Sequence, residues 1–143
     1  MPYKYLGDIA LADVAFEASG ATLEELFVAA ADATMNVMVA ELSTIQRLEE
    51  VRFAVEHPEL ELLLFNFLNE LLFFKDARRL LLRVESVTIA THPTLLTLEA
   101  IAHGEPLDPT RHAQLVDVKA VTLHRFRVER NERGWQATVI LDI

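Results

Sequence analysis

The sequence contains no cysteine and only four glycines among its 143 residues. The lack of cysteine excludes disulfides, thiol catalysis and zinc sites built from cysteine ligands. With so few glycines, a loop that cradles phosphate is not expected, and neither a P-loop nor a Rossmann glycine pattern occurs. The G-x-S-x-G pattern of serine hydrolases is also missing. These absences argue against the common nucleotide-binding and nucleophile-based enzymes.

The sequence also lacks a long, uninterrupted apolar segment. Its most apolar stretch runs from Leu60 to Phe74, and Asn66, Asn69 and Glu70 interrupt it. That stretch is shorter than the roughly 20 residues that a membrane-spanning helix requires. No apolar signal segment follows Met1. We therefore expect a cytoplasmic protein that has no membrane partner.

Basic residues are scarce, with 13 Lys plus Arg against 22 Asp plus Glu and a formal net charge of −9. Direct binding of nucleic acid is not expected, because such binding gains most of its affinity from neutralising phosphates. An acidic surface suits a cation or a basic protein partner, and it also serves simply to keep a chain in solution. The sequence does not indicate an oligomeric state.

Hydrophobic residues make up 52% of the chain, enough for the core of one domain of this length. Thr22 and Glu25 have the spacing of a capping box, which predicts a helix from there to about Val39. Pro58 suits the first turn of a second helix over about 58–75, which is apolar on most sides and should be buried.

Alternation of apolar and polar residues predicts the strands. The predicted strands are Tyr3–Leu6, Ala12–Ala18, Leu48–Glu56, Leu80–Ala90, Leu95–His103, Val116–Leu123, Phe126–Arg130 and Trp135–Asp142. A hairpin turn is expected at Asn131–Gly134. This order predicts a single α+β domain over residues 1–143, with two main helices packed on a mostly antiparallel β-sheet.

Two aspartates interrupt otherwise apolar strands. Asp142 lies near the end of the run Val139–Ile143, beside the α-carboxylate of Ile143, and Asp13 lies between Ala12 and Val14. Neighbouring negative groups repel, and a hard cation such as calcium or magnesium, which takes oxygen ligands, would relieve the repulsion. The alternative is that each aspartate simply faces solvent at a strand end.

Lys119 lies in the predicted strand Val116–Leu123, where alternation would place it on the same face as Asp117 and Val121. One interpretation makes it the cross-strand partner of a carboxylate. The other makes it a contact to an anionic ligand or partner.

The five histidines form no HxH or HExxH pair. His103 and His112 flank a turn-rich segment that begins at Gly104, so the two rings could meet in space. A histidine metal site there is one interpretation, and capping or surface roles are the other.

From end to end the chain resembles the archease family. The resemblance is carried by Ala12-Asp-Val14 with Thr22–Phe27, Leu68–Leu72, His103-Gly-Glu-Pro with Asp108-Pro and His112, Asp117–Thr122, Gly134-Trp135, and Val139–Ile143. Before its first metal aspartate the family usually reads His-Thr-Ala-Asp-Val-Gly. Here the stretch reads Ala10-Leu-Ala-Asp-Val-Ala15, so the aspartate remains while the His-Thr pair and the glycine are replaced.

The resemblance implies an accessory protein rather than an enzyme. Archeases assist the RtcB-type RNA ligase in tRNA splicing and RNA repair, promoting its guanylylation and its multiple turnover, so RNA would be reached only through the ligase. The family's metal ligands map onto Asp13, the Asp142 carboxylate and the main chain of Ile143. The divalent ion would be calcium, magnesium or manganese. The family's functionally important lysine maps onto Lys119.

Two other functions compete with this one. An independent metal-dependent hydrolase would use Asp13 and Asp142 and would need a base near neutral pH, for which His103 or His112 is the candidate. A general protein chaperone would expose a large apolar patch and would not depend on a metal ion.

Overall fold

The computed structural model describes residues 2–7 and 13–143, and it confirms the predicted α+β class. The described elements are β1 (Tyr3–Leu6), β2 (Asp13–Gly20), α1 (Leu23–Met38), the short 3₁₀ helix η1 (Leu42–Thr44), β3 (Glu49–His57), α2 (Leu60–Arg78), β4 (Leu80–Thr91), β5 (Leu96–Pro106), β6 (Ala120–Asn131) and β7 (Gly134–Asp142).

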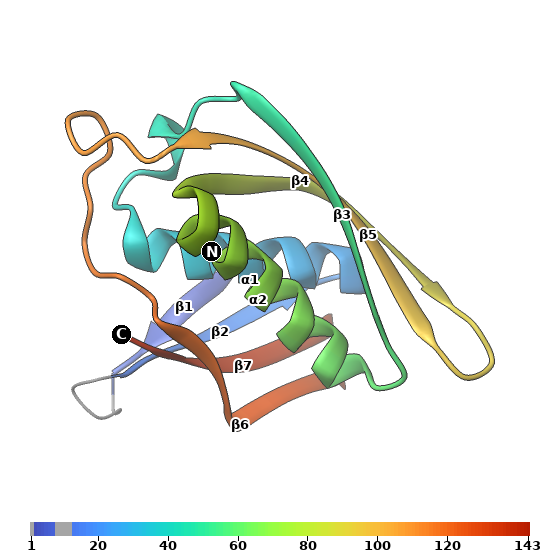
Figure 1. Ribbon diagram of the computed structural model, residues 1–143. Helices are drawn as coiled ribbons and strands as arrows, with labels where there is room; N and C mark the ends of the chain where they lie inside the picture. The colour runs from blue at the N-terminus through green and yellow to red at the C-terminus, as the bar shows by residue number, and fades with distance from the viewer. Residues whose placement is uncertain (1, 8–12) are drawn as a thin grey trace.

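The strands form two antiparallel sheets rather than one. One sheet has four strands in the order β1-β2-β7-β6, and the other has three in the order β3-β5-β4. Figure 1 shows the two sheets above and below α1 and α2, and each of these two helices contacts strands of both sheets. The core therefore lies between the sheets, where the apolar faces of both helices are buried.

Helix α1 begins where the capping-box pattern predicts. The Thr22 hydroxyl accepts a hydrogen bond from the Glu25 N–H at 3.1 Å, and the Glu25 carboxylate accepts one from the Ala21 N–H at 2.8 Å. These bonds satisfy backbone donors that the first turn of a helix cannot pair internally. Phe27 of α1 then packs against Phe67 of α2, with ring centroids 5.5 Å apart.

Helix α2 is buried as predicted, but its bounds differ from the expected 58–75. Pro58 lies before the helix rather than in its first turn, because Glu59 is the extended N-cap residue and its N–H is bonded to the His57 ring. At the other end the helix continues to Arg78, and Arg79 ends it in the left-handed conformation. In the described part of the chain, this and every other helix is too short or too polar to cross a membrane.

The predicted strands Val116–Leu123 and Phe126–Arg130 are wrong as separate elements. They belong to one strand, β6, which begins only at Ala120 and whose pairing with β7 shifts between Thr122 and Arg127. Such a bulge breaks the period of two that sequence alternation relies on. Residues 107–119, which precede β6 and connect it to β5, form no strand, and we call this segment the strap.

The hairpin turn between β6 and β7 is confirmed. Asn131 pairs with Gly134, and Gly134 adopts a φ of 133°. An added Cβ at this glycine would lie 2.4 Å from the Gly20 carbonyl oxygen. Gly134 therefore adopts the positive φ that the turn requires, and its lack of a side chain lets the end of β2 pack closely against it.

Candidate functional site

Strands β2 and β7 bring the two predicted metal aspartates together. In the antiparallel register, Asp13 is directly opposite Asp142, although 128 residues lie between them in the sequence. Residues directly opposite on one face have Cβ atoms about 4.5–5.5 Å apart. Asp142 also pairs with Ala120 of β6, so it lies in the middle of the sheet and Asp13 on the neighbouring strand.

The two carboxylates have no cationic partner among residues 2–7 and 13–143, since none of the ion pairs there includes either one. Both residues are partly buried, and like charges directly opposite one another destabilise a sheet. Ile143 follows immediately, partly buried against the core, so its main chain is held beside the aspartates. This arrangement presents carboxylate and main-chain oxygens, the ligand types that hard cations prefer.

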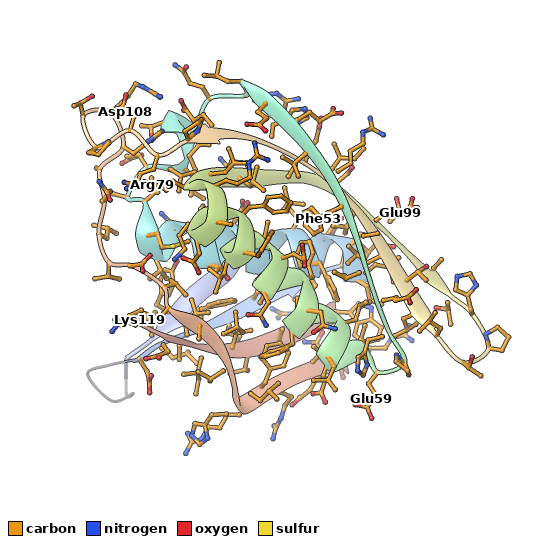
Figure 2. The ribbon with its side chains drawn as sticks, in the orientation of Figure 1. Phe53, Glu59, Arg79, Glu99, Asp108 and Lys119 are labelled. Carbon is orange, nitrogen blue, oxygen red and sulfur yellow. The ribbon has the colours of Figure 1, made fainter. Side chains whose placement is uncertain are left out.

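Lys119 lies next to this pair, but not in the predicted way. Its N–H donates to the Asp142 carbonyl at 2.8 Å, which fixes the main chain of Asp142 and leaves the carboxylate for other partners. The interpretation that Lys119 shares a strand face with Asp117 is wrong, because both residues precede β6. The Lys119 side chain is exposed at the end of the molecule where β7 ends (Figures 1 and 2).

The strap that carries Lys119 is fixed along its length by backbone hydrogen bonds. It runs from the three-stranded sheet, past the end of α1, to the four-stranded sheet (Figure 1). The bonds, in chain order, are Leu107 N–H to Arg79 C=O at 2.7 Å, Ala40 N–H to Ala113 C=O at 2.8 Å, Leu115 N–H to Met38 C=O at 2.9 Å and Lys119 N–H to Asp142 C=O at 2.8 Å. The strap is therefore an ordered connection even though it lacks regular secondary structure.

Lys75 of α2 holds the last part of the strap. Its ammonium donates to the Asp117 carboxylate at 2.7 Å and to the Val118 carbonyl at 2.8 Å, and it pairs with Asp76 at 2.6 Å. Burial acts to lower the pKa of Lys75, but the hydrogen bonds that it donates to Asp117 and Asp76, together with their negative charge, outweigh burial and raise that pKa overall. Lys75 therefore stays charged and positions the residues immediately before Lys119.

A second cluster, which sequence reasoning missed, fixes the start of the strap. Glu105 is 1% exposed, and its carboxylate accepts hydrogen bonds from the Arg111 guanidinium, at 2.9 Å for one of them, and from the Gln46 backbone N–H. The hydrogen bonds from Arg111 lower the pKa of Glu105 to about 2, although burial acts in the opposite direction. The predicted strand ends at His103, so the sequence places Glu105, which belongs to β5, in the turn-rich segment and does not indicate that it is buried.

His112 completes the cluster. The ring is buried, with Nε2 lying 3.1 Å from the Glu105 carboxylate, and Nδ1 accepts from the Asp108 N–H at 2.9 Å. Since Nδ1 is an acceptor, the hydrogen-bond pattern assigns the proton of the neutral ring to Nε2, which donates to Glu105. Arg111 and His112 of the strap are thereby bonded to Glu105 of β5, and these polar contacts fix the strap to that strand.

His103 and His112 do not share a site. The His103 ring lies between two other carboxylates, with Nε2 3.3 Å from Glu50 and Nδ1 3.0 Å from Glu85. Within the described ranges, 2–7 and 13–143, no three His, Asp or Glu side chains are grouped so that they could hold a metal ion. A metal at Asp13 and Asp142 would therefore depend on main-chain or external oxygens as well.

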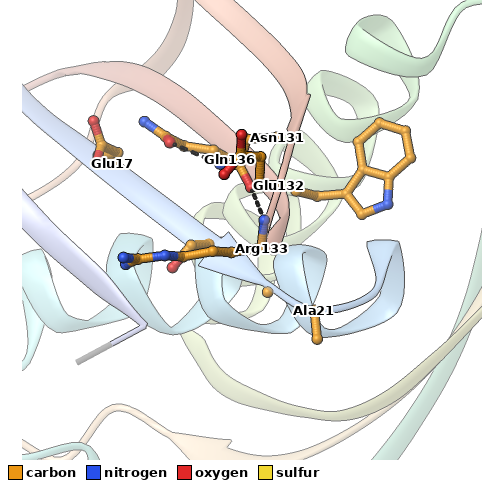
Figure 3. A pocket seen from close by; sticks show the side chains of 9 residues that line it. Glu17, Ala21, Asn131, Glu132, Arg133 and Gln136 are labelled. Atoms are coloured by element: carbon orange, nitrogen blue, oxygen red, sulfur yellow. Dashed lines mark hydrogen bonds between the residues drawn. The ribbon is translucent and has the colours of Figure 1, made fainter.

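An open pocket lies elsewhere, at the opposite end of β2 and β7. Figure 3 shows this open depression of about 580 Å³, which is lined by Glu17, Ala21 and the turn residues 131–133, among others. Its dashed lines are hydrogen bonds of the turn itself, from Asn131 to Gln136 at 3.2 Å and from the Arg133 N–H to Asn131 at 2.9 Å. These contacts stabilise the hairpin and indicate no reaction chemistry.

Comparisons with family models, with curated proteins and with solved structures all find similarity to archeases. The model of the Archease protein family matches residues 3–143. Protein archease of Pyrococcus abyssi is 38% identical over 92% of this chain and 93% of its own length, and that of Archaeoglobus fulgidus is 34% identical over 100% of both. The solution structure of Methanobacterium thermoautotrophicum protein 1598 has 33% identity and a TM-score of 0.86 over 99% of both chains. A Thermotoga maritima archease, described as a possible chaperone, has a similar fold, with a TM-score of 0.62 at 20% identity over 94% of this chain and 93% of its own.

Proposed function

This chain belongs to the archease family, and we propose that it activates an RtcB-type RNA ligase by means of a divalent cation held at Asp13, Asp142 and the main chain of Ile143. The function is that of an accessory protein, acting in tRNA splicing and RNA repair through the ligase. The single observation that carries the proposal is the register that sets Asp13 opposite Asp142.

The donor set fits a hard cation. Two carboxylates on neighbouring strands, with main-chain oxygen beside them, match the oxygen ligands that calcium, magnesium and manganese accept. Calcium takes six to eight oxygens and magnesium keeps several waters, so a site with few protein ligands leaves positions for water or for a partner. When bound, the cation supplies positive charge that neutralises the opposed carboxylates.

The residues around the cation have separate roles. Asp13 and Asp142 provide the ligands, and the Lys119 N–H fixes the main chain of Asp142. The exposed Lys119 ammonium is then available for an anionic group of the ligase or its nucleotide. In this proposal the cation neutralises the carboxylate pair, and Lys119 presents positive charge beside it, at one end of an acidic protein.

The geometry favours an accessory protein over an independent hydrolase. The base that a hydrolase requires was expected at His103 or His112. His103 is on β5, in the sheet that does not contain Asp13 and Asp142, and the His112 side chain is fully buried against Glu105. A general chaperone would need a large exposed apolar patch, whereas the exposed large apolar side chains of the described chain are spread over several elements.

Replacement of Asp142 by asparagine tests the proposal. Ligation is followed at limiting ligase with GTP and manganese, with and without this protein. Asp142→Asn replaces a charged ligand with a weaker, neutral amide and removes one of two opposed charges, so it should abolish stimulation while the free energy of unfolding without metal stays equal or rises slightly. The control is Glu132→Gln, an exposed change in the turn at the other end of β7.

Metal binding is measured separately by the thermal shift that calcium or manganese produces. A ligand at 100 times its Kd stabilises the folded state by about 2.7 kcal/mol, and Asp142→Asn should lose this gain. An Asp142→Asn protein that stimulates the ligase fully would contradict the proposal. Hydrolysis by this protein alone would favour the enzyme, and unselective suppression of aggregation would favour the chaperone.

A further inference from the structure

Two consecutive apolar side chains of the strap are exposed to solvent. Leu115 is 60% exposed and Val116 is 45% exposed. In a regular strand one of two consecutive side chains faces the core, but here neither does, because the strap is not a strand.

The backbone that carries these side chains is fixed rather than loose. The Leu115 N–H donates to the Met38 carbonyl at 2.9 Å and the Val116 N–H to the Val37 carbonyl at 3.5 Å, both at the end of α1. A preformed backbone loses little conformational entropy when a partner binds, so exposed apolar groups on it are efficient contacts.

A small cleft lies directly against this part of the strap. It has a volume of about 100 Å³, and Met38, Leu81 and Leu107 line it together with Leu115. Lys75 and Asp117 add a charged side to the same cleft. An apolar floor with an ionic border is the arrangement that accepts one apolar side chain of a partner and orients the charges around it.

The charge around the cleft is negative towards solvent. Asp76 and Asp117 have side chains that are 57% and 66% exposed, whereas Lys75, which neutralises them only in part, is 11% exposed. Asp13 and Asp142 lie at the far end of the same strap, joined to it through Lys119, and they do not contribute to the charge beside the cleft. The complementary surface is basic, with an apolar side chain projecting from it.

We propose that Leu115, Val116 and the adjoining cleft form the docking surface for a basic patch of the RNA ligase that inserts one apolar side chain. This inference rests on the proposed function, and it separates two tasks within one segment. The middle of the strap binds the partner, and its end presents Lys119 and Asp142 to it. Because Lys75 and Glu105 fix the strap, docking at Leu115 sets the position of the metal site relative to the ligase.

The test uses the full chain and the purified RtcB-type ligase of the same organism. Leu115→Ser and Val116→Ser are compared with Leu123→Ser, which truncates a leucine of similar exposure, 56%, on β6. Direct binding is measured by calorimetry, and stimulation of ligation is measured over a range of concentrations of this protein. Thermal unfolding of each variant provides the check on folding.

Leu115→Ser should weaken binding about tenfold, the effect typical of an interface anchor, and Val116→Ser should weaken it in the same direction. The concentration for half-maximal stimulation should rise by the same factor while the maximal stimulation stays that of the unmodified protein. Leu123→Ser should leave both quantities unchanged. Added salt should weaken binding of the unmodified protein, because the contact includes opposite charges.

Unchanged binding in both strap variants would overturn the docking surface, as would an equal loss in Leu123→Ser. A lower maximum with unchanged half-saturation would also overturn it, because the strap would then act after docking. Leu115-dependent binding without any stimulation would support the docking surface and reject the proposed activation. Absence of binding by the unmodified protein would reject both.

Discussion

Glu105→Gln is the change whose consequence can be worked out most fully from the structure. The glutamate is 1% exposed and its pKa is lowered from its ordinary value of 4.5 to about 2, chiefly by hydrogen bonds from Arg111. A shift of that size corresponds to about 3 kcal/mol of stability when the group is ionised. Arg111 is 37% exposed, and solvent screening of its charge reduces the value to roughly 2 kcal/mol.

The contribution depends on pH in one direction. Because the folded-state pKa of Glu105 lies below the unfolded one, the stability is fully present above pH 4.5 and is lost as the pH falls towards 2. Glutamine carries no charge, so Glu105→Gln should lower the free energy of unfolding by roughly 2 kcal/mol at neutral pH, which corresponds to a Tm lower by roughly 6–8 °C. The difference between the two proteins should shrink as the pH approaches 2.

Urea denaturation of both proteins over a series of pH values measures this difference. The control is Glu99→Gln, an exposed glutamate on the same strand with no ion pair in the described part of the chain. The loss of stability that other carboxylates, such as Glu50, cause at low pH is the same in both proteins, so it cancels in the comparison. A difference that stays constant from pH 7 to acid would refute the reasoning, because it would show that packing rather than charge makes Glu105 stabilising.

Two further changes test the elements that position the site. Thr22→Ala removes the side-chain acceptor for the Glu25 N–H and should lower the free energy of unfolding by about 1 kcal/mol, measured by urea denaturation; an unchanged value would show that the cap is dispensable. Lys75→Met keeps the apolar stem but removes the bonds to Asp117 and Val118, so the Lys119 amide should exchange faster with deuterium in an NMR measurement, with Lys75→Arg restoring protection. Equal protection in Lys75→Met would show that α2 does not hold the end of the strap.

Local patterns predicted most of the secondary structure. The capping box at Thr22 and the hairpin at Asn131–Gly134 are chemical signals that act within a few residues, so the sequence contains all the information they need. The division into two sheets depends on which strands pair over long separations, and alternation within a strand carries no such information. The bulge in β6 was missed for the related reason that it interrupts the alternation from which strands are recognised.

The candidate site was likewise predicted only where local patterns carry the information. Asp13 and Asp142 stood out because each is an acid in an apolar strand, but their opposition is a property of the β2–β7 register that neither strand reveals alone. Lys119 was assigned from family resemblance, and its expected strand was wrong because the strap precedes β6. The buried carboxylate of Glu105 was missed because its partners, Arg111 and Gln46, are brought to it by segments without periodicity.

The position of β7 has a consequence for synthesis on the ribosome. Strand β7 pairs with both β2 and β6, so the four-stranded sheet lacks its central member until residues 134–142 have been made. Until then the edges of β2 and β6 that pair with β7 stay unpaired in a nascent or truncated chain, and unpaired strand edges promote aggregation. The same residues contribute Asp142, so an unfinished chain lacks both the sheet and half of the opposed carboxylate pair. Premature termination in this region should therefore yield insoluble protein rather than a folded fragment.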